Sequence, residues 1–355
     1  MVFALLILQS FSYYIPPYSA NLQFAHSQLE LTDKKLLIDN ADSLYDQQKY
    51  TEALTLYDKV LASDPNDISA LSGRGDVFFA QNRCEEAFES YDRILTIDVN
   101  NVYALSSKGA CLYSLGQNEE AIVWLDKALA IDPNDVLVLV NKGASLQELG
   151  RNEEAIVWLD KALAIDPNEI YAFEKKAFAL QDIGEYEEAI IWYDKILAIE
   201  PENTVALINK GIALDDKGDH DEAINLFDET LAIAPKDIDA LNNKAVALHH
   251  KGEYEEAIIW YDKALDISPD QVYTLNNKGR ALFDIGKFSE AIIWFDKALE
   301  INPDEIDVLI NKSHALFNLG DEKEALIYID KALEVEPNNE NILELKEAFF
   351  EKERK

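Results

Sequence analysis

Apolar and polar residues alternate along most of the chain with the period of amphipathic helices. In one representative segment, Leu139, Gly143 and Leu146 recur at spacings of four and three residues, which places them on one face of an α-helix. This segment closes at Gly150, and a second apolar-periodic segment opens with acidic residues at Glu153. Glycine favours the carboxyl end of a helix, and acidic residues favour its amino terminus. The pattern therefore predicts pairs of short antiparallel helices.

Prolines give the period of this pattern. They lie 34 residues apart, or a multiple of that distance, at Pro65, Pro133, Pro167, Pro201, Pro235, Pro269, Pro303 and Pro337. Val99 stands in the one missing place without a change of register. An internal period of this length is typical of helical repeat arrays. With the proline as position 32, the sequence divides into nine repeats: 34–67, 68–101, 102–135, 136–169, 170–203, 204–237, 238–271, 272–305 and 306–339.

Small residues recur where the two helices of a repeat are expected to cross. Position 20 is alanine in all nine repeats, position 8 is glycine, alanine or serine, and position 28 is leucine throughout. Glycine occupies position 15 in seven of the nine repeats, where a left-handed backbone would end the first helix. One repeat cannot bury these apolar positions alone, so neighbouring repeats must stack.

The small, leucine, alanine and proline positions together resemble the tetratricopeptide repeat family. The resemblance covers residues 34–339. It implies an all-α fold, a right-handed superhelical solenoid of antiparallel helix pairs whose concave wall is built from the first helices. Residues 340–355 continue as an amphipathic segment with Ile342, Leu345 and Phe349 on one face, and we expect a capping helix there.

The composition adds a strongly acidic surface to this picture. The chain carries 67 acidic and 32 basic residues, a formal net charge of −35. Such a surface repels phosphate backbones, so we expect no nucleic-acid partner. It also favours encounter with basic protein segments.

Residues 1–33 precede the first repeat and are predicted to be a leader outside the array. Residues 1–29 contain no Lys, Arg, Asp or Glu, and the apolar run from Val2 to Leu8 is too short to span a bilayer, so we expect no transmembrane helix. The segment resembles parts of a secretory signal, although the basic residues expected at its start are absent. Two interpretations stay open, a signal whose true start lies upstream and a disordered leader. The localisation is accordingly open between the cytoplasm and an exported or membrane-associated site.

Catalytic and cofactor motifs are absent from the sequence. It contains no phosphate-binding glycine loop, no HExxH and no GxSxG, so we expect neither an enzyme nor a bound cofactor. Cys84 and Cys111 lack metal-ligand spacing, and we interpret His249, His250 and His314 as groove or surface residues. We therefore predict no metal site. Tryptophans at position 23 are assigned to packing between repeats, and aspartates at position 25 to a solvated face.

Asparagine recurs at position 6 of the first helices, in five of the six repeats from residue 136 onward. Asparagine is a poor helix former unless its side chain has a partner, and its amide matches the C=O and N–H of a passing peptide. First helices about 10 Å apart would meet about every third residue of an extended peptide. The resemblance supports this, since some superhelical members of the family hold peptide main chain with an asparagine ladder. The alternative is that these asparagines only bond neighbouring helices.

Neighbouring positions complete a predicted peptide-binding surface. Its residues are Asn141, Lys175, Asn209, Asn243, Asn277, Asn311, Phe178, Ile212, Val246, Arg280, Phe283, His314 and Phe317. We expect a scaffold or adaptor that binds an extended, neutral or basic segment of another protein in a concave groove. The alternatives are a structural or complex-assembly protein with array-to-array contacts, and a non-catalytic accessory subunit of an enzyme. The partner, the pathway and the oligomeric state stay open.

Overall fold

The computed structural model describes residues 33–353, with side chains described as far as residue 349. The predicted leader lies outside these residues except for its last position. Within them the chain forms helices joined by short connections and no strand, which confirms the all-α prediction. None of the described helices combines the length and apolar character needed to cross a membrane.

The helices alternate between first and second members of the predicted repeats. They are residues 33–46, α2 (Tyr50–Ser63), α3 (Ile68–Ala80), α4 (Cys84–Ile97), α5 (Val102–Ser114), α6 (Asn118–Ile131), α7 (Val136–Glu148), α8 (Asn152–Ile165), α9 (Ile170–Asp182), α10 (Tyr186–Ile199), α11 (Thr204–Lys217), α12 (His220–Ile233), α13 (Ile238–His250), α14 (Tyr254–Ile267), α15 (Val272–Asp284), α16 (Phe288–Ile301), α17 (Ile306–Leu319), α18 (Glu322–Val335) and α19 (Glu340–Glu353).

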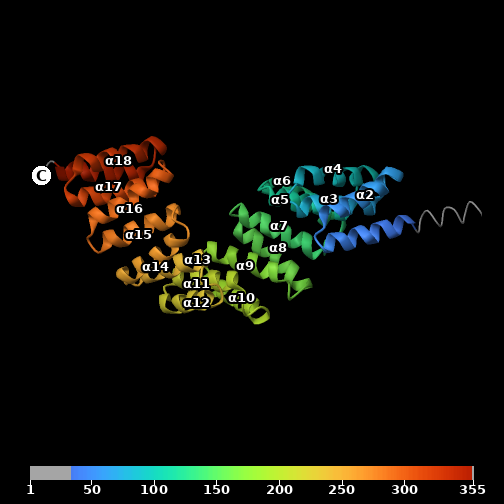
Figure 1. Cartoon of the computed structure of the whole chain (residues 1–355), viewed down its shortest axis with the longest axis horizontal. Helices are drawn as coiled ribbons and strands as arrows, with labels where there is room; N and C mark the ends of the chain where they lie inside the picture. The colour runs from blue at the N-terminus through green and yellow to red at the C-terminus, as the bar shows by residue number, and fades with distance from the viewer. Residues whose placement is uncertain (1–32, 354–355) are drawn as a thin grey trace, which may run out of the picture. The chain divides into compact units, whose positions relative to one another are not determined.

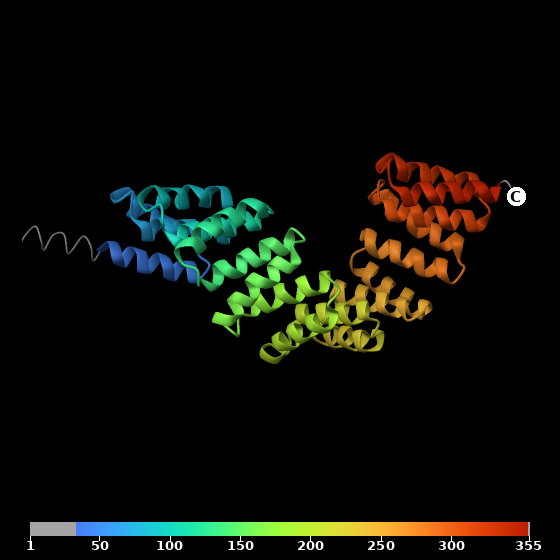
Figure 2. The same cartoon turned by 180° about the vertical axis from the view of Figure 1, so that it is seen from behind.

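Two compact units make up the chain, divided between Leu149 and Gly150. The first unit runs through α7, and the second begins at α8. Within each unit, successive helices pack side by side (Figure 1). First helices also contact one another across repeats, α5 with α7 in the first unit and α11 with α13, α13 with α15 and α15 with α17 in the second. The first helices therefore line one face of each unit. Figure 2 shows the helices from behind.

Helix starts follow the polar residues that come after each proline. The Asp67 carboxylate accepts a hydrogen bond from the Ala70 N–H at 2.8 Å, and the Asn203 side chain accepts one from the Ala206 N–H at 2.9 Å. Each bond satisfies a backbone donor that has no partner inside the helix. The proline therefore ends one helix, and the residues just after it begin the next.

A left-handed residue ends the first helix of each described pair. Gly286 adopts φ +78°, and the six other glycines at this repeat position also have positive φ. In the first two repeats, Gln48 and Asn82 occupy the same position with φ of 59° and 57°. A side chain makes this conformation more costly than it is for glycine, so the first two repeats carry backbone strain that the later ones avoid.

Small side chains allow the two helices of a repeat to cross closely. The position-20 alanines, such as Ala291, are fully buried in every repeat. A Cβ atom added at Gly279 would lie only 2.4 Å from Cε1 of Phe295, and one added at Gly211 would lie 2.6 Å from Cε1 of Phe227. In these two repeats the aromatic ring at position 24 therefore occupies the space that glycine at position 8 leaves.

From the third repeat onward, a lysine at position 7 connects each repeat to the one before it. Lys210 Nζ lies 2.6 Å from Asp194 Oδ1 of the preceding repeat. Equivalent ion pairs are Lys108–Asp92, Lys142–Asp126, Lys176–Asp160, Lys244–Asp228, Lys278–Asp262, Lys312–Asp296 and Lys346–Asp330. Lys278 Nζ also lies 3.5 Å from the ring centroid of Trp294. The position-25 aspartates, expected to be only solvated, thus form ion pairs between repeats, and the tryptophans hold the paired lysines.

Candidate functional site

The predicted peptide-binding residues lie on the first helices α7, α9, α11, α13, α15 and α17. Asn141 belongs to the first unit, and the others belong to the second. On α9, Lys175 Nζ lies 5.4 Å from the ring centroid of Tyr171, and Phe178 is half-buried. The structure therefore gathers most of the predicted residues into the first-helix layer of one unit.

The asparagines differ in what their side chains do. Asn243 Nδ2 donates to the carbonyl oxygen of Asp239 in its own helix at 2.9 Å. Asn311 Nδ2 donates to Asn276 Oδ1 on α15, also at 2.9 Å. The second bond joins neighbouring first helices, the arrangement that the alternative interpretation of the asparagines expects.

Two hollows that share one arginine bring the central predicted residues together. The larger has a volume of about 220 Å³, and its lining includes Ile212, Asn243, Val246, Asn277 and Arg280. The smaller, of about 130 Å³, is lined in part by Arg280, Phe283, Asn311 and His314. The amides of Asn209 and Asn277 make no hydrogen bond to any other described residue. Asn277 therefore offers an unused donor and acceptor at the larger hollow.

The terminal helix α19 contacts the predicted surface at its carboxyl end. The ring of Phe317 stacks on that of Phe349 with centroids 4.1 Å apart. His314 meets the same ring edge-on at 5.7 Å, and burial lowers the pKa of His314. These two predicted residues are therefore partly engaged within the array.

An aspartate and three histidines lie beside the larger hollow. Asp215 Oδ1 lies 2.6 Å from His220 Nδ1, and Asp215 Oδ2 lies 2.8 Å from His250 Nδ1. His249 Nε2 lies 2.7 Å from Asp284 Oδ2. Burial lowers the pKa of His249, and the bond to Asp284 raises it in part. No short sequence motif connects Asp215, His220 and His250, because they come from three different helices.

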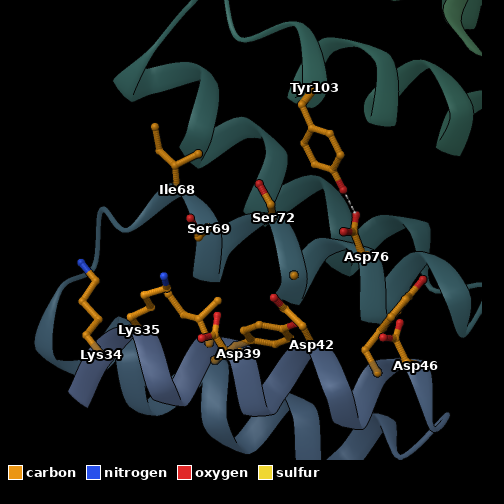
Figure 3. A pocket seen from close by; sticks show the side chains of 14 residues that line it. Lys34, Lys35, Asp39, Asp42, Asp46, Ile68, Ser69, Ser72, Asp76 and Tyr103 are labelled. Atoms are coloured by element: carbon orange, nitrogen blue, oxygen red, sulfur yellow. Dashed lines mark hydrogen bonds between the residues drawn. The ribbon is translucent and has the colours of Figure 1, made fainter. Parts of the chain in front are cut away.

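The first unit has a separate hollow on its first-helix face, outside the predicted surface, which we call the acidic hollow. Its volume is about 1000 Å³. Asp39, Asp42 and Asp46 line it from the helix of residues 33–46, and Asp76 lines it from α3 (Figure 3). Tyr103 of α5 donates a hydrogen bond to Asp76 across the hollow (Figure 3). Asp39 stands at position 6, and Asp42 and Asp76 stand at position 9, so following the groove positions into the first two repeats would have indicated this site.

Tyrosine hydroxyls bind two of these four carboxylates. Tyr57 donates to Asp42 Oδ1 at 2.6 Å, and Tyr91 donates to Asp76 Oδ1 at 3.1 Å. Burial raises the pKa of Asp76, and the hydrogen bonds from Tyr103 and Tyr91 lower it in part. Lys34 and Lys35 also line this hollow, and Lys34 pairs with Asp64 and Asp67 outside it. Four carboxylates beside tyrosine rings remain a surrounding suited to a further cationic side chain.

Comparison with known proteins identifies the repeats. Profiles described as tetratricopeptide repeat match residues 38–101, 137–169, 168–236, 208–272, 272–305 and 306–339, and one described as TPR repeat matches residues 109–150. The chain belongs to the tetratricopeptide repeat family. The comparison with curated proteins found no match to this TPR chain.

Solved structures similar to this TPR protein share its fold. A tetratricopeptide repeat protein from Parabacteroides merdae is 21% identical with a TM-score of 0.61, over 70% of this chain and 98% of its own. A chain in the structure of the APC/C hetero-tetramer Cut9–Hcn1 is 18% identical with a TM-score of 0.57, over 84% of this chain and 59% of its own. PilW, a type IV pilus biogenesis factor, is 22% identical with a TM-score of 0.56, over 58% of this chain and 96% of its own. At these identities the likeness concerns the fold alone.

The family and its fold give the general role of the chain. TPR repeats are protein-interaction scaffolds and are typically non-catalytic. The chain is therefore a protein-binding scaffold of the TPR type.

Proposed function

We propose that this TPR protein binds an extended segment of a partner along the first-helix face of its second unit. The observation that carries the proposal is the larger hollow, where Ile212, Val246 and Asn277 come together from α11, α13 and α15. The two aliphatic side chains are half-buried and offer apolar contact to a peptide side chain. The free amide of Asn277 offers a donor and an acceptor to its main chain.

The charge of the chain favours a partner segment that carries Lys or Arg. Asp215 and Asp216 line the larger hollow beside the predicted residues, although Arg280 also faces it. In the first unit, Lys34 and Lys35 line the hollow around Asp42 and Asp76 together with the carboxylates, and Lys34 is paired with Asp64 and Asp67. Each unit thus offers carboxylates to a basic segment, and electrostatic attraction of this kind raises the association rate at low salt.

The test uses peptides selected for binding to the full chain from a displayed library of extended sequences. Affinity of the selected peptides is then measured by fluorescence anisotropy for the wild type and for Asn209→Ala/Asn277→Ala. We expect the double variant to bind at least about 10-fold more weakly, because two hydrogen bonds to main chain of roughly 1 kcal/mol each are lost. Circular dichroism verifies that the variant keeps its helices.

Asn225→Ala is the matched control, because Asn225 is exposed on the second helix α12. It should leave peptide affinity within about twofold, since it removes an amide that lies away from the first helices. If the selected peptides bound Asn209→Ala/Asn277→Ala as tightly as the wild type, the asparagine mechanism would be wrong. An enrichment of acidic rather than basic peptides would contradict the charge argument.

A second candidate function, array-to-array assembly, rests on a series of exposed side chains at position 22. In the second unit these are Val157, Ile191, Ile259, Ile293 and Ile327, each 53–55% exposed. Aliphatic residues repeated at one exposed position can form an apolar contact surface. Concentration-dependent oligomers of the wild type in sedimentation equilibrium, abolished in Ile259→Asp/Ile293→Asp, would favour this function over peptide binding.

A further inference from the structure

We propose that Asp215, His220 and His250 form a binding site for a divalent transition-metal ion, with Zn²⁺ as its representative. The three residues lie at the end of α11, the start of α12 and the end of α13. Their ligand atoms all lie within 4.8 Å of one another. Imidazole nitrogen and carboxylate oxygen are ligands that Zn²⁺ and related cations accept.

The geometry needs only a small adjustment to admit a cation. Zn²⁺ bonds of about 2.0–2.1 Å at tetrahedral angles place two ligand atoms roughly 3.4 Å apart. The present distances from Asp215 to Nδ1 of His220 and of His250 are 2.6 and 2.8 Å. Opening each by a fraction of an ångström is within the reach of side-chain rotation, because His220 and His250 are 27% and 47% exposed. Each Nδ1 must present a lone pair, so the imidazole proton then resides on Nε2.

The charge around Asp215 also favours a cation. Its side chain is only 7% exposed, and within the described residues its ion-pair partners are the two imidazoles alone. Lysines nearby in sequence pair elsewhere, Lys217 with Asp219 and Lys251 with Asp221. A buried carboxylate is normally paired with a cation or coordinates a metal. Arg280 lines the same hollow but forms no ion pair with Asp215 among the described residues, so a divalent ion would supply positive charge directly at this carboxylate.

The hollow beside the cluster contains a further polar group without a partner. Tyr261 of α14 is fully buried and lines the same hollow as Asp215 and His250. Its hydroxyl has no hydrogen-bond partner among the described residues. The equivalent tyrosines Tyr57 and Tyr91 donate to aspartates at position 9. In the repeat of Tyr261, position 9 is Val246, whose side chain cannot accept a hydrogen bond. The Tyr261 hydroxyl therefore remains available to a polar ligand in the hollow. Three protein ligands leave a fourth tetrahedral position for such a ligand.

This proposal departs from the prediction of no metal site, which considered His249, His250 and His314 together. His314 lies on α17, away from the cluster helices, and His249 bonds to Asp284. The ligand set instead combines His250 with His220, a histidine that belongs to the preceding repeat.

The test is titration of the tag-free, chelator-treated full chain with ZnCl₂ by calorimetry, and with CoCl₂ by visible absorption. We expect about one bound ion per chain and the strong visible absorption of tetrahedral Co²⁺. His220→Ala and His250→Ala should each weaken Zn²⁺ binding at least about 10-fold, since each removes a direct ligand. Zn²⁺ should raise the Tm of the wild type and not that of the variants.

His249→Ala is the matched control, because His249 is adjacent to a ligand and contacts a different aspartate. It should change Zn²⁺ affinity less than about threefold, and Asn209→Ala/Asn277→Ala should leave it unchanged, which separates this proposal from peptide binding. Wild-type protein that bound no Zn²⁺ or Co²⁺ would overturn the site and leave a hydrogen-bonded His–Asp–His cluster. Equal loss of affinity in His249→Ala and His220→Ala would overturn the assignment of ligands.

Discussion

The ion pair between neighbouring repeats allows a quantitative test at Lys278. Its side chain is 6% exposed, it pairs with Asp262 of the preceding repeat, and its Nζ lies 3.5 Å from the ring centroid of Trp294. Lys278→Met keeps most of the aliphatic stem and removes the charge. A desolvated cation over an aromatic face contributes about 2 kcal/mol, and a pair with a half-exposed carboxylate contributes at most about 1 kcal/mol.

The desolvation of the ammonium opposes these contributions, so we expect Lys278→Met to lower the free energy of unfolding by about 1–2 kcal/mol. Asp262→Asn should cost about 0.5–1 kcal/mol through loss of the pair. Part of that cost is offset, because the chain has a net charge of −35 and loses one repulsive carboxylate. The double variant should cost no more than Lys278→Met, because Asp262 has no cation to lose once Lys278 is replaced.

Urea unfolding of the full chain, followed by circular dichroism, measures the three variants. The non-additivity of the double-mutant cycle isolates the pair and should be about 0.5–1 kcal/mol at low salt, decreasing at high salt. Equal m-values across the set are needed for the comparison. Additive costs, or a coupling energy that does not change with salt, would refute the view that the pair joins the two repeats electrostatically.

Other predictions follow from single positions. Gln48→Gly should raise the free energy of unfolding by about 0.5–1 kcal/mol in urea unfolding, because Gln48 has φ 59°. Gly286→Ala should lower the free energy of unfolding by about 1 kcal/mol, because Gly286 has φ +78°. Changes of the opposite sign would contradict the strain argument. Burial raises the pKa of the Cys111 thiol, so its reaction with a thiol reagent should be slow in the folded chain and fast in urea; rapid labelling under native conditions would contradict this. Burial lowers the pKa of His314 in the folded chain, so as pH falls the unfolded chain protonates this imidazole first, and stability is lost below about pH 6.5. His314→Gln should reduce that loss in urea titrations at several pH values. An unchanged pH dependence would show that His314 does not contribute.

The repeat pattern predicts the local fold closely because each boundary depends on residues close together in sequence. The proline at position 32 and the following polar residue determine where one helix ends and the next begins, as Asp67 shows by accepting the Ala70 N–H. Glycine at position 15 marks the left-handed turn, and even the exceptions Gln48 and Asn82 follow the same backbone. Such local preferences are visible in a single sequence.

Interactions between repeats were harder to anticipate. The sequence predicts solvated aspartates at position 25, because their lysine partners stand 16 residues away in the next repeat. Asp215 and His250 are 35 residues apart, so no short motif contains them. The acidic hollow of the first unit depends on Asp42 and Asp76 from different repeats, and a search for asparagine at position 6 passes over them. These sites arise from stacking, which brings together side chains that sequence spacing separates.

The lysines at position 7 have a consequence for how other molecules meet this protein. Several of them are shielded by an aromatic ring at position 23 and by the neighbouring repeat. Lys278 lies over Trp294 and Lys312 over Tyr328, and their side chains are only 6% and 5% exposed. Their charges count in the net charge of the chain, yet few of their ammonium groups are accessible to an anion at the surface. A molecule that collides with the array therefore encounters fewer accessible ammonium groups than a count of lysines suggests. Non-specific adhesion to polyanions should accordingly be weak even where the sequence is rich in lysine.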